Sequence, residues 1–518
     1  MVDQVFEPTD GQAAPLVPPR SGSAVEGPTF AGHPVGLYVL FLTEMWERFT
    51  FYGMRALLVL FMTNEMRKGD SEANLIYGSY QALVYALPLF GGIIADKLLG
   101  HRRAIYFGGV TMAIGSLLLA APAEWTFYLG MGFVACGNRY FKPNISTIVG
   151  DLYAERDPRR DSAFTIFYAG INIGAMGGGA LCGWIAYAPW GGWRLAFGSA
   201  SIFLLFGLLI FTYGKRYLPG LGFSPNPELL RSRAIGPLSW EWTIYACSWL
   251  MIPIFALLLL QYEVMDYIFN PLALLALGFL IYQAFSLPTK VERNKLLAAL
   301  VLIVFSVLFW GFYEQGGGSL NLYTERNVDL NIFGIEFNPA SVNNTLNPML
   351  VILLSPFFAL LWPGLQRFRA NPSTPFKFVL GLLLLSAGFY TFVIGGRNAD
   401  VGVVPIAYFV MGYLFLSAGE LCLSPIGLSM VTNLSPARLV GMMMGAWFLA
   451  SAMGQFVAGK IGSLMAMPTG TTGEAVDPTV SLPIYSGMFE YIAIVSAGAA
   501  FVLLLLVPLL KRWMHDVH

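Results

Sequence analysis

The chain has 518 residues, of which 56% are hydrophobic, 15% are aromatic and only 12% are charged. Soluble globular proteins carry about 25% charged residues, so this composition excludes a set of water-soluble domains and predicts a protein solvated by lipid. The 30 lysines and arginines balance the 30 aspartates and glutamates, and no basic excess points to a nucleic-acid partner.

Residues 1–34 lack the apolar core of a signal peptide and predict a disordered cytoplasmic tail. The cysteines lie within apolar runs and form no close pair, which indicates core residues rather than disulfides or a metal site; they are Cys136, Cys182, Cys247 and Cys422. We therefore expect neither a metal nor a cofactor.

Apolar runs bounded by charged residues, proline or glycine predict fourteen membrane-spanning helices. Their approximate ranges are 35–63, 73–95, 103–121, 125–149, 162–187, 194–213, 243–262, 269–287, 296–316, 341–362, 376–395, 402–426, 438–463 and 484–510. An even number of spans places both termini on one side, and twenty loop lysines and arginines lie on that side against five on the other. Because positive loops stay in the cytoplasm, we expect a multi-pass membrane protein with both termini in the cytoplasm.

The spans divide into three groups by their polar content. Most charges and glycines within spans fall in 35–213 and 296–510, whereas the two spans of 243–287 have acidic residues mainly at their ends. We predict an all-α protein with a six-helix bundle (35–213), a linker with two extra membrane helices (214–295), a second six-helix bundle (296–510) and a cytoplasmic tail (511–518). Two six-helix bundles around a midplane site form the major-facilitator fold.

The first span carries four charges, Glu44, Glu47, Arg48 and Arg55, on one face of the helix. Each charge near the bilayer centre costs roughly 2.5–3.5 kcal/mol on insertion scales. This face is therefore expected to line a cavity or to pair internally, with Glu44 and Arg48 spaced to bond along the helix. A static ion cluster that fixes helix packing is the alternative.

Three further charges lie within or at the ends of later spans. Lys142 precedes Pro143 in the fourth span, Glu314 ends the ninth span, and Glu420 lies in the middle of the twelfth. The two carboxylates have no basic neighbour in sequence, so we expect their partners in the first bundle, where exchangeable pairs provide a gate. A lysine that reaches the membrane surface and permanent ion pairs are the alternatives.

Other motifs exclude several activities. The chain has no P-loop, no HExxH and no GxSxG element, and the glycines of 174–179 lie within a span, where they favour close helix contact. All four histidines lie at span ends, in loops or in the tail. We therefore predict that the chain is not an enzyme and that a transported proton is carried by a carboxylate.

Several ordered segments together resemble the proton-dependent oligopeptide transporter family, a branch of the major facilitators. Residues 44–52 (EMWERFTFY) resemble its ExxERFxYY signature and residues 164–174 its second signature; 141–144, 314–315, 346–348, 420–429 and 445–449 match further motifs in order. Phe51 departs from the signature, which has tyrosine at this position.

The resemblance implies proton-driven import of di- and tripeptides across the bacterial inner membrane by alternating access, without an obligate protein partner. It implies proton coupling through Glu44, Glu47, Arg48 and Glu314. The implied peptide contacts are Arg48, Lys142 and Tyr52 for the carboxylate, Glu420, Asn172 and Asn347 for the amino group, and Tyr80, Trp447 and Ser451 for side chains, with Arg55 also in the site. The implied gate pairs are Arg55–Glu314 and Lys142–Glu420.

Three other readings of the chain remain open at this point. A carrier of nitrate or another organic anion would use the same basic residues but has less need of Glu420. A non-transporting receptor would not need costly charges in both bundles. An intramembrane enzyme would need a catalytic motif that the sequence lacks.

Overall fold

The structure is a computed structural model that describes residues 27–154, 157–368, 370–467 and 476–515. Of the predicted N-terminal tail, residues 1–26 fall outside the described residues. Residues 29–34 form a short hairpin of β1 (Thr29–Phe30) and β2 (His33–Pro34) directly before the first helix.

Each of the fourteen predicted spans coincides with a long helix, which confirms the predicted all-α membrane fold. The first group is α1 (Val35–Asn64), α2 (Asp70–Ala86) continued by α3 (Pro88–Ile94) and a π-helical turn (Ala95–Leu99), α4 (His101–Leu119), α5 (Glu124–Asp151), α6 (Arg160–Tyr187) and α7 (Trp193–Gly214). A 3-10 turn (Lys215–Tyr217), α8 (Pro227–Arg231) and the hairpin of β3 (Arg233–Ile235) and β4 (Leu238–Ser239) lead to α9 (Trp240–Leu260) and α10 (Val264–Phe285).

The second group begins with a broken helix. Here α11 (Lys290–Tyr313) passes through a 3-10 turn (Glu314–Gly317) into α12 (Ser319–Asn327). The hairpin of β5 (Asn331–Ile332) and β6 (Ile335–Glu336) follows, and then α13 (Pro339–Arg367), α14 (Thr374–Arg397), α15 (Ile406–Leu434), α16 (Val440–Ser463) and α17 (Pro478–Met514).

Short polar signals fix several helix starts. The side chains of Ser239, Thr289 and Asn338 accept hydrogen bonds from backbone N–H groups of the first turns of α9, α11 and α13. Asp477 does the same for α17, where Pro478 occupies the first helical position. These caps satisfy donors that a helix leaves free at its N-terminus, so each span begins at a defined residue.

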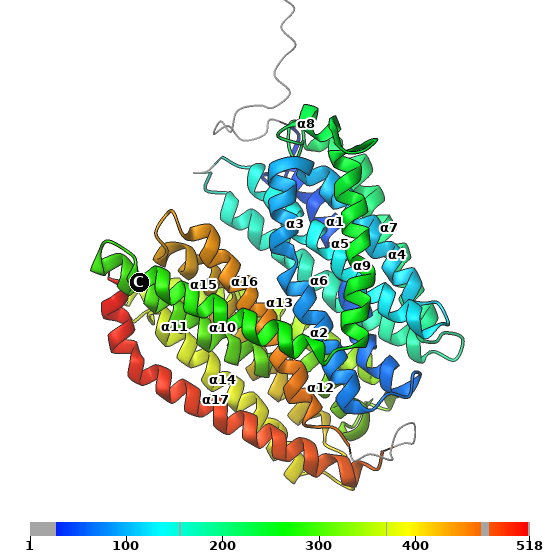
Figure 1. Cartoon of the computed structure of the whole chain (residues 1–518). Helices are drawn as coiled ribbons and strands as arrows, with labels where there is room; N and C mark the ends of the chain where they lie inside the picture. The colour runs from blue at the N-terminus through cyan, green and yellow to red at the C-terminus, as the bar shows by residue number, and fades with distance from the viewer. Residues whose placement is uncertain (1–26, 155–156, 369, 468–475, 516–518) are drawn as a thin grey trace, which may run out of the picture.

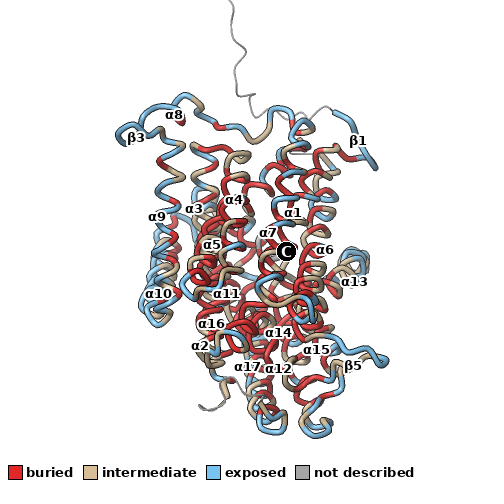
Figure 2. The backbone as a smooth tube through the Cα atoms, turned by 90° about the vertical axis from the view of Figure 1, so that its right-hand side faces the viewer, coloured by how far each residue is buried: buried red, intermediate tan, exposed pale blue. Residues whose placement is uncertain are grey.

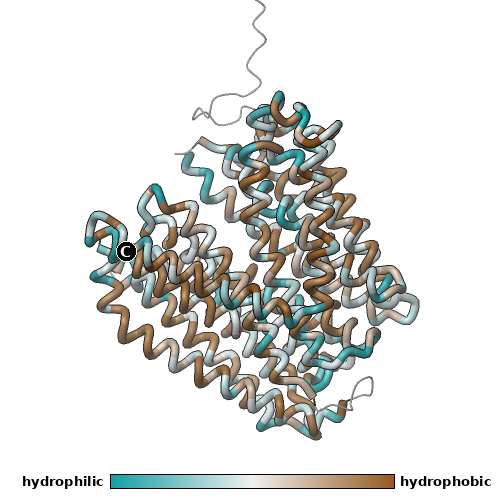
Figure 3. Tube along the Cα trace, in the orientation of Figure 1, coloured by the Kyte–Doolittle hydropathy of each residue, from teal (hydrophilic) through white to brown (hydrophobic). Residues whose placement is uncertain are grey.

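The outer surface of the described helices is apolar, as lipid contact requires. Eleven helices are long and apolar enough to cross a membrane, and α1, α4 and α5 are the remaining long helices of the described chain. On α9 and α10 large apolar side chains such as Leu250, Tyr267 and Leu274 point outward, and Figure 3 shows the hydrophobic residues along the outer helices. The chain is therefore a multi-pass membrane protein.

Within the first group, glycines allow α6 to approach α1 closely. A Cβ on Gly174 would lie 2.2 Å from the carbonyl oxygen of Met45, and one on Gly178 would lie 2.1 Å from that of Phe49. The glycine stretch of 174–179 thus makes the helix contact expected from the sequence. Figure 2 shows the buried residues concentrated between the helices and the exposed ones at the ends and on the outer faces.

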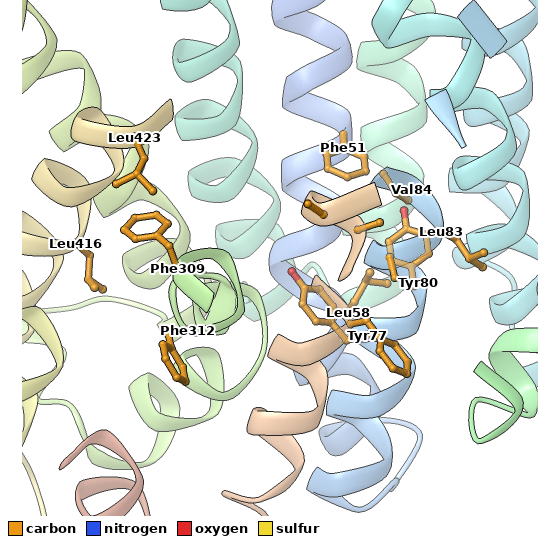
Figure 4. Packing of buried hydrophobic residues seen from close by; sticks show 14 of the residues in the cluster. Phe51, Leu58, Tyr77, Tyr80, Leu83, Val84, Phe309, Phe312, Leu416 and Leu423 are labelled. Atoms are coloured by element: carbon orange, nitrogen blue, oxygen red, sulfur yellow. The ribbon is translucent and has the colours of Figure 1, made fainter. Parts of the chain in front are cut away.

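The two groups meet mainly through α2 against α16 and α6 against α13. The inserted helices divide between the groups: α9 packs on α5, whereas α10 packs on α11 and α16 (Figure 1). Buried apolar side chains of both groups, such as Phe51 and Tyr80 in one and Phe309 and Leu416 in the other, are seen in Figure 4. We call the end where α1 begins the terminal side and the end where α1 stops the opposite side.

Candidate functional site

A cavity of about 320 Å³ lies between the two groups of helices. Its first-group wall includes Arg48, Tyr52, Arg55, Tyr85, Lys142, Tyr168 and Asn172. Its second-group wall includes Tyr313, Glu314, Asn343, Asn344, Asn347, Glu420, Ser424, Ser451 and Gln455. The cavity is therefore polar and is shared by both bundles, as a midplane transport site requires.

The charges of α1 form a compact cluster around one arginine. Arg48 Nε lies 2.9 Å from Glu44 Oε1 and also pairs with Glu47, and all three side chains are at most 2% exposed. Asn138 donates from Nδ2 to Glu47 Oε1 at 3.3 Å. Arg48 reaches the cavity, whereas the two glutamates are not among its lining residues. One cation thus offsets two carboxylates behind the cavity wall.

About two helical turns beyond Arg48 on α1, Arg55 pairs with Glu314 of the broken helix. The same guanidinium donates from Nε to the Tyr77 hydroxyl at 2.6 Å. Glycine is required beside this pair, because a Cβ on Gly317 would lie 1.7 Å from the Tyr77 hydroxyl. The Arg55–Glu314 pair implied by the resemblance is present and joins the two bundles.

The other implied pair, Lys142–Glu420, is not formed in this conformation, and the ion pairs of the described chain do not include it. The Lys142 ammonium lies 4.9 Å from the centre of the Tyr85 ring. Glu420 instead accepts hydrogen bonds from the Tyr313 hydroxyl and from Asn347 Nδ2, the latter at 3.0 Å. Both groups line the cavity and each has contacts within its own bundle, so this gate pair stays a prediction for another state.

Two residues expected to line the site lie elsewhere. Tyr80 is fully buried between helices and does not line the cavity; Tyr85, one turn and a half further along α2, does. Trp447 is nearly buried and packs against Gly427, where a Cβ would lie 2.1 Å from the indole. The remaining implied peptide contacts, which are Tyr52, Asn172, Asn347 and Ser451, all line the cavity.

The sequence analysis missed a network of amides at the opposite end of the cavity. Asn343 and Asn344 both donate to Asn321 Oδ1, at 2.6 and 2.9 Å, and the Tyr413 hydroxyl donates to Asn343. Asn321 Nδ2 in turn lies 3.2 Å from the carbonyl oxygen of Ala56 in α1. The spacing of Asn343 and Asn347, four residues apart on one helix face, was the signal available in the sequence.

Beyond this network, α12 closes the opposite side against the first bundle. Arg326 forms a two-point ion pair with Asp70 of α2, at 2.6 and 2.8 Å. Glu325 accepts from Asn64 Nδ2 at 2.6 Å and from the Tyr187 hydroxyl at 2.8 Å. Both contacts join the bundles, so the opposite side is closed in this structure.

The two walls carry opposite charge. The first bundle presents the cations Arg48, Arg55 and Lys142, and the second presents the carboxylates Glu314 and Glu420. Two bundles of membrane-spanning helices around such a cavity define a membrane transporter of the major-facilitator type.

The family follows from comparison with known proteins. The model of the POT family matches residues 102–477, and the chain belongs to this family. It is 35% identical to the peptide transporter YePEPT of Yersinia enterocolitica over 95% of this chain and 97% of that protein. It is 33% identical to the dipeptide and tripeptide permease A of Salmonella typhimurium over 93% of this chain and 94% of the permease. The family resemblance drawn from the motifs is confirmed, and the relatives are transporters rather than enzymes.

Solved structures agree with this assignment. A crystal structure of a peptide transporter POT in complex with sulfate matches with a TM-score of 0.80 at 32% identity, covering 95% of this chain and 98% of that one. A mutant of a peptide transporter POT in complex with alafosfalin also matches with a TM-score of 0.80 at 32% identity, covering 94% of this chain and 97% of that one.

Proposed function

We propose that the protein imports di- and tripeptides with protons across the bacterial inner membrane. The observation that carries this proposal is the charge division of the cavity, with cations on the first-bundle wall and carboxylates on the second. A zwitterionic peptide carries one charge of each sign at its ends, so it complements both walls and draws the bundles together.

In this proposal Arg48, Lys142 and Tyr52 hold the peptide carboxylate. Glu420, with Asn172 and Asn347, holds the amino group. Glu420 already accepts from Tyr313 and Asn347, which orients its carboxylate at the cavity wall. A carboxylate at this place favours a cationic group over an anion such as nitrate.

We propose that access to the cavity alternates between the two sides, and the contacts that differ between them support this. The opposite side, which we assign to the cell exterior, is closed by Arg326–Asp70 and Arg55–Glu314. Lys142 and Glu420 form no pair, and we propose that they pair when the terminal, cytoplasmic side closes. Protonation of Glu314 would free Arg55, while Glu44 and Glu47 would couple proton release to Arg48.

The test is dialanine transport by purified protein in proteoliposomes, wild type beside Glu47→Gln. We expect wild type to accumulate dialanine only under an inward proton gradient. The variant should exchange dialanine in counterflow but fail to accumulate it. If wild type transports no peptide in either assay, the peptide assignment is wrong and nitrate is the next substrate to measure.

A further inference from the structure

Two tight turns on the opposite side of the second bundle hold bulky apolar residues in the left-handed backbone region. Phe333 (φ 54°) and Gly334 (φ 82°) join β5 to β6, and Val401 (φ 47°) and Gly402 (φ 80°) form a turn between α14 and α15. Two-residue turns with positive φ at both positions favour asparagine, aspartate or glycine, because bulky or branched side chains crowd the backbone there. Phe333 and Val401 therefore occupy positions that the local backbone disfavours.

The side chains at these turns are also exposed. Phe333 is 100% exposed and Val401 is 74% exposed, and Ile335 and Phe337 beside the first turn are exposed as well. Packing within the chain therefore does not explain why the turns carry apolar residues. A group of exposed apolar side chains of this kind marks a surface that contacts another apolar phase or molecule.

The β5–β6 hairpin separates apolar from polar residues. Asn331 pairs with Glu336, and Ile332 pairs with Ile335. Because neighbouring residues of a strand point to opposite faces, Ile332, Ile335 and Phe337 share one face and the polar pair shares the other. One face of the hairpin suits lipid and the other suits water.

The lipid-facing surface of the second bundle begins beside these turns. Val410 and Met411, in the second turn of α15, are exposed, and so is Val403 just before this helix. Figure 2 shows β5 projecting sideways next to α15, so the hairpin lies at the lateral edge of the molecule. The apolar turns thus continue a surface that faces the bilayer, which makes lipid their partner.

Hydrogen bonds join the two turns to the helix that closes the opposite side. The Asp329 N–H donates to the Val404 carbonyl at 2.9 Å, and the Val404 N–H donates to the Asn327 carbonyl at 2.7 Å. Asn327, the last residue of α12, also donates from Nδ2 to the Gly402 carbonyl at 2.9 Å. The preceding residue, Arg326, forms the ion pair that closes this side. The turns and α12 are therefore one connected unit.

Interfacial aromatic residues are distributed unequally between the bundles. Exposed tryptophans mark the opposite side of the first bundle, at Trp125, Trp184 and Trp190. The described residues at the opposite ends of the second-bundle helices include no tryptophan. Since tryptophans gather at the boundary between membrane and water, Phe333 and Phe337 supply aromatic rings where the second bundle lacks them.

We propose that the two turns insert into the boundary between headgroups and acyl chains on the opposite side and anchor the second bundle there. Amphipathic segments enter this boundary by about 5–10 Å. The side chains that enter the lipid are Phe333, Ile335, Phe337 and Val401, whereas Glu336 stays in water. The anchor holds the gate helix α12 at a fixed depth, whatever substrate the cavity carries.

Spin-label accessibility in phospholipid proteoliposomes tests the insertion. Phe333→Cys and Glu336→Cys are made in a background in which the exposed Cys247 is replaced by serine, and each is labelled with a nitroxide. Glu336 is the matched control, because it lies on the same hairpin and is also exposed. Oxygen concentrates in lipid and a nickel chelate in water. The ratio of their collision rates should be several times higher at position 333 than at 336, and equal ratios would overturn the insertion.

The same labels distinguish lipid from a second copy of the chain. In lipid, the label at position 333 should collide rapidly with oxygen. Low collision rates with both reagents would mean that protein covers the turn, and they would overturn lipid as the partner. A short distance between the labels of two copies would then identify the second copy as the cover.

A further variant separates the anchor from the turn. Asn-Gly is the preferred pair for a turn of this type, so Phe333→Asn keeps the hairpin but removes the apolar tip. A nitroxide at Ile335→Cys should become several times more accessible to the nickel chelate in Phe333→Asn. Phe333→Trp, which keeps an interfacial aromatic ring, should leave this accessibility at its original value. Unchanged accessibility in Phe333→Asn would overturn the anchor.

Discussion

A close backbone contact between the bundles, Gly78 of α2 against Gly459 of α16, gives a direct test of how the opposite side closes. A Cβ on Gly78 would lie 2.6 Å from Gly459 Cα and 2.9 Å from Gly459 N, whereas ordinary contacts begin near 3.4 Å. The helices must therefore separate by about 0.8 Å, the difference between the first and last of these distances. Because the atoms met are backbone, no side-chain rotation relieves the clash.

The cost of Gly78→Ala follows from this overlap. Overpacking of a close interface costs about 1–3 kcal/mol. Since the clash exists only where the opposite side is closed, the cost changes the balance of states by about 5–150-fold toward the state open on that side. We expect the folded protein to persist, because alanine favours the helix more than glycine does.

Spin-label distance measurements on purified protein can detect this shift. Labels at positions 65 and 335 lie on the opposite side, one in each bundle, and both positions are exposed. Of the four cysteines, all within the described residues, Cys247 is the exposed one and is first replaced by serine. Gly441→Ala is the matched control, since nothing lies within 4 Å of its Cβ. A distance distribution in Gly78→Ala that equals wild type and the control would refute the reasoning.

Three further predictions concern other contacts of the structure. Asp70→Asn removes the charge that holds Arg326, so the same labels should report more of the state open on the opposite side. The exchanged pair (Asp70→Arg with Arg326→Asp) should restore part of the closed population. No recovery would contradict a gate based on charge. Ser248→Ala deprives the buried Arg139 guanidinium of an acceptor at 2.7 Å. Thermal unfolding should show that the free energy of unfolding falls by about 1–3 kcal/mol. An unchanged melting curve would show that α9 is held in place without this hydrogen bond. Glu420→Gln should weaken dialanine binding about tenfold or more, as expected for the loss of a hydrogen bond to a charged group. Binding of N-acetylated dialanine, which lacks the free amino group, should weaken less. Equal losses of affinity for the two peptides would contradict contact between Glu420 and the amino group.

The sequence was sufficient for the architecture. Apolar runs and loop charges predicted all fourteen long helices, because a membrane admits few alternatives to helices of this length. The charges of α1 also revealed their pairing, since Glu44 and Arg48 are four residues apart and a helix brings them together. Local spacing thus determined what happens within one helix.

Relations between helices required the tertiary structure. Tyr80 and Tyr85 are both tyrosines of α2, yet only the rotation of the helix decides that the second lines the cavity and the first is buried. The break at 314–318, which produces α12 and its Arg326–Asp70 contact, was read as the end of a span.

Whether Lys142 and Glu420 pair is also decided by the tertiary structure. The sequence identified both residues as charges that need a reason to lie in the membrane, but whether they touch depends on how far the bundles are apart. In this state Glu420 is bonded to Asn347 and Tyr313, and Lys142 lies over Tyr85. Helix formation is local and follows from the order of residues, whereas the separation of two bundles is a global balance of contacts that a transporter must be able to change.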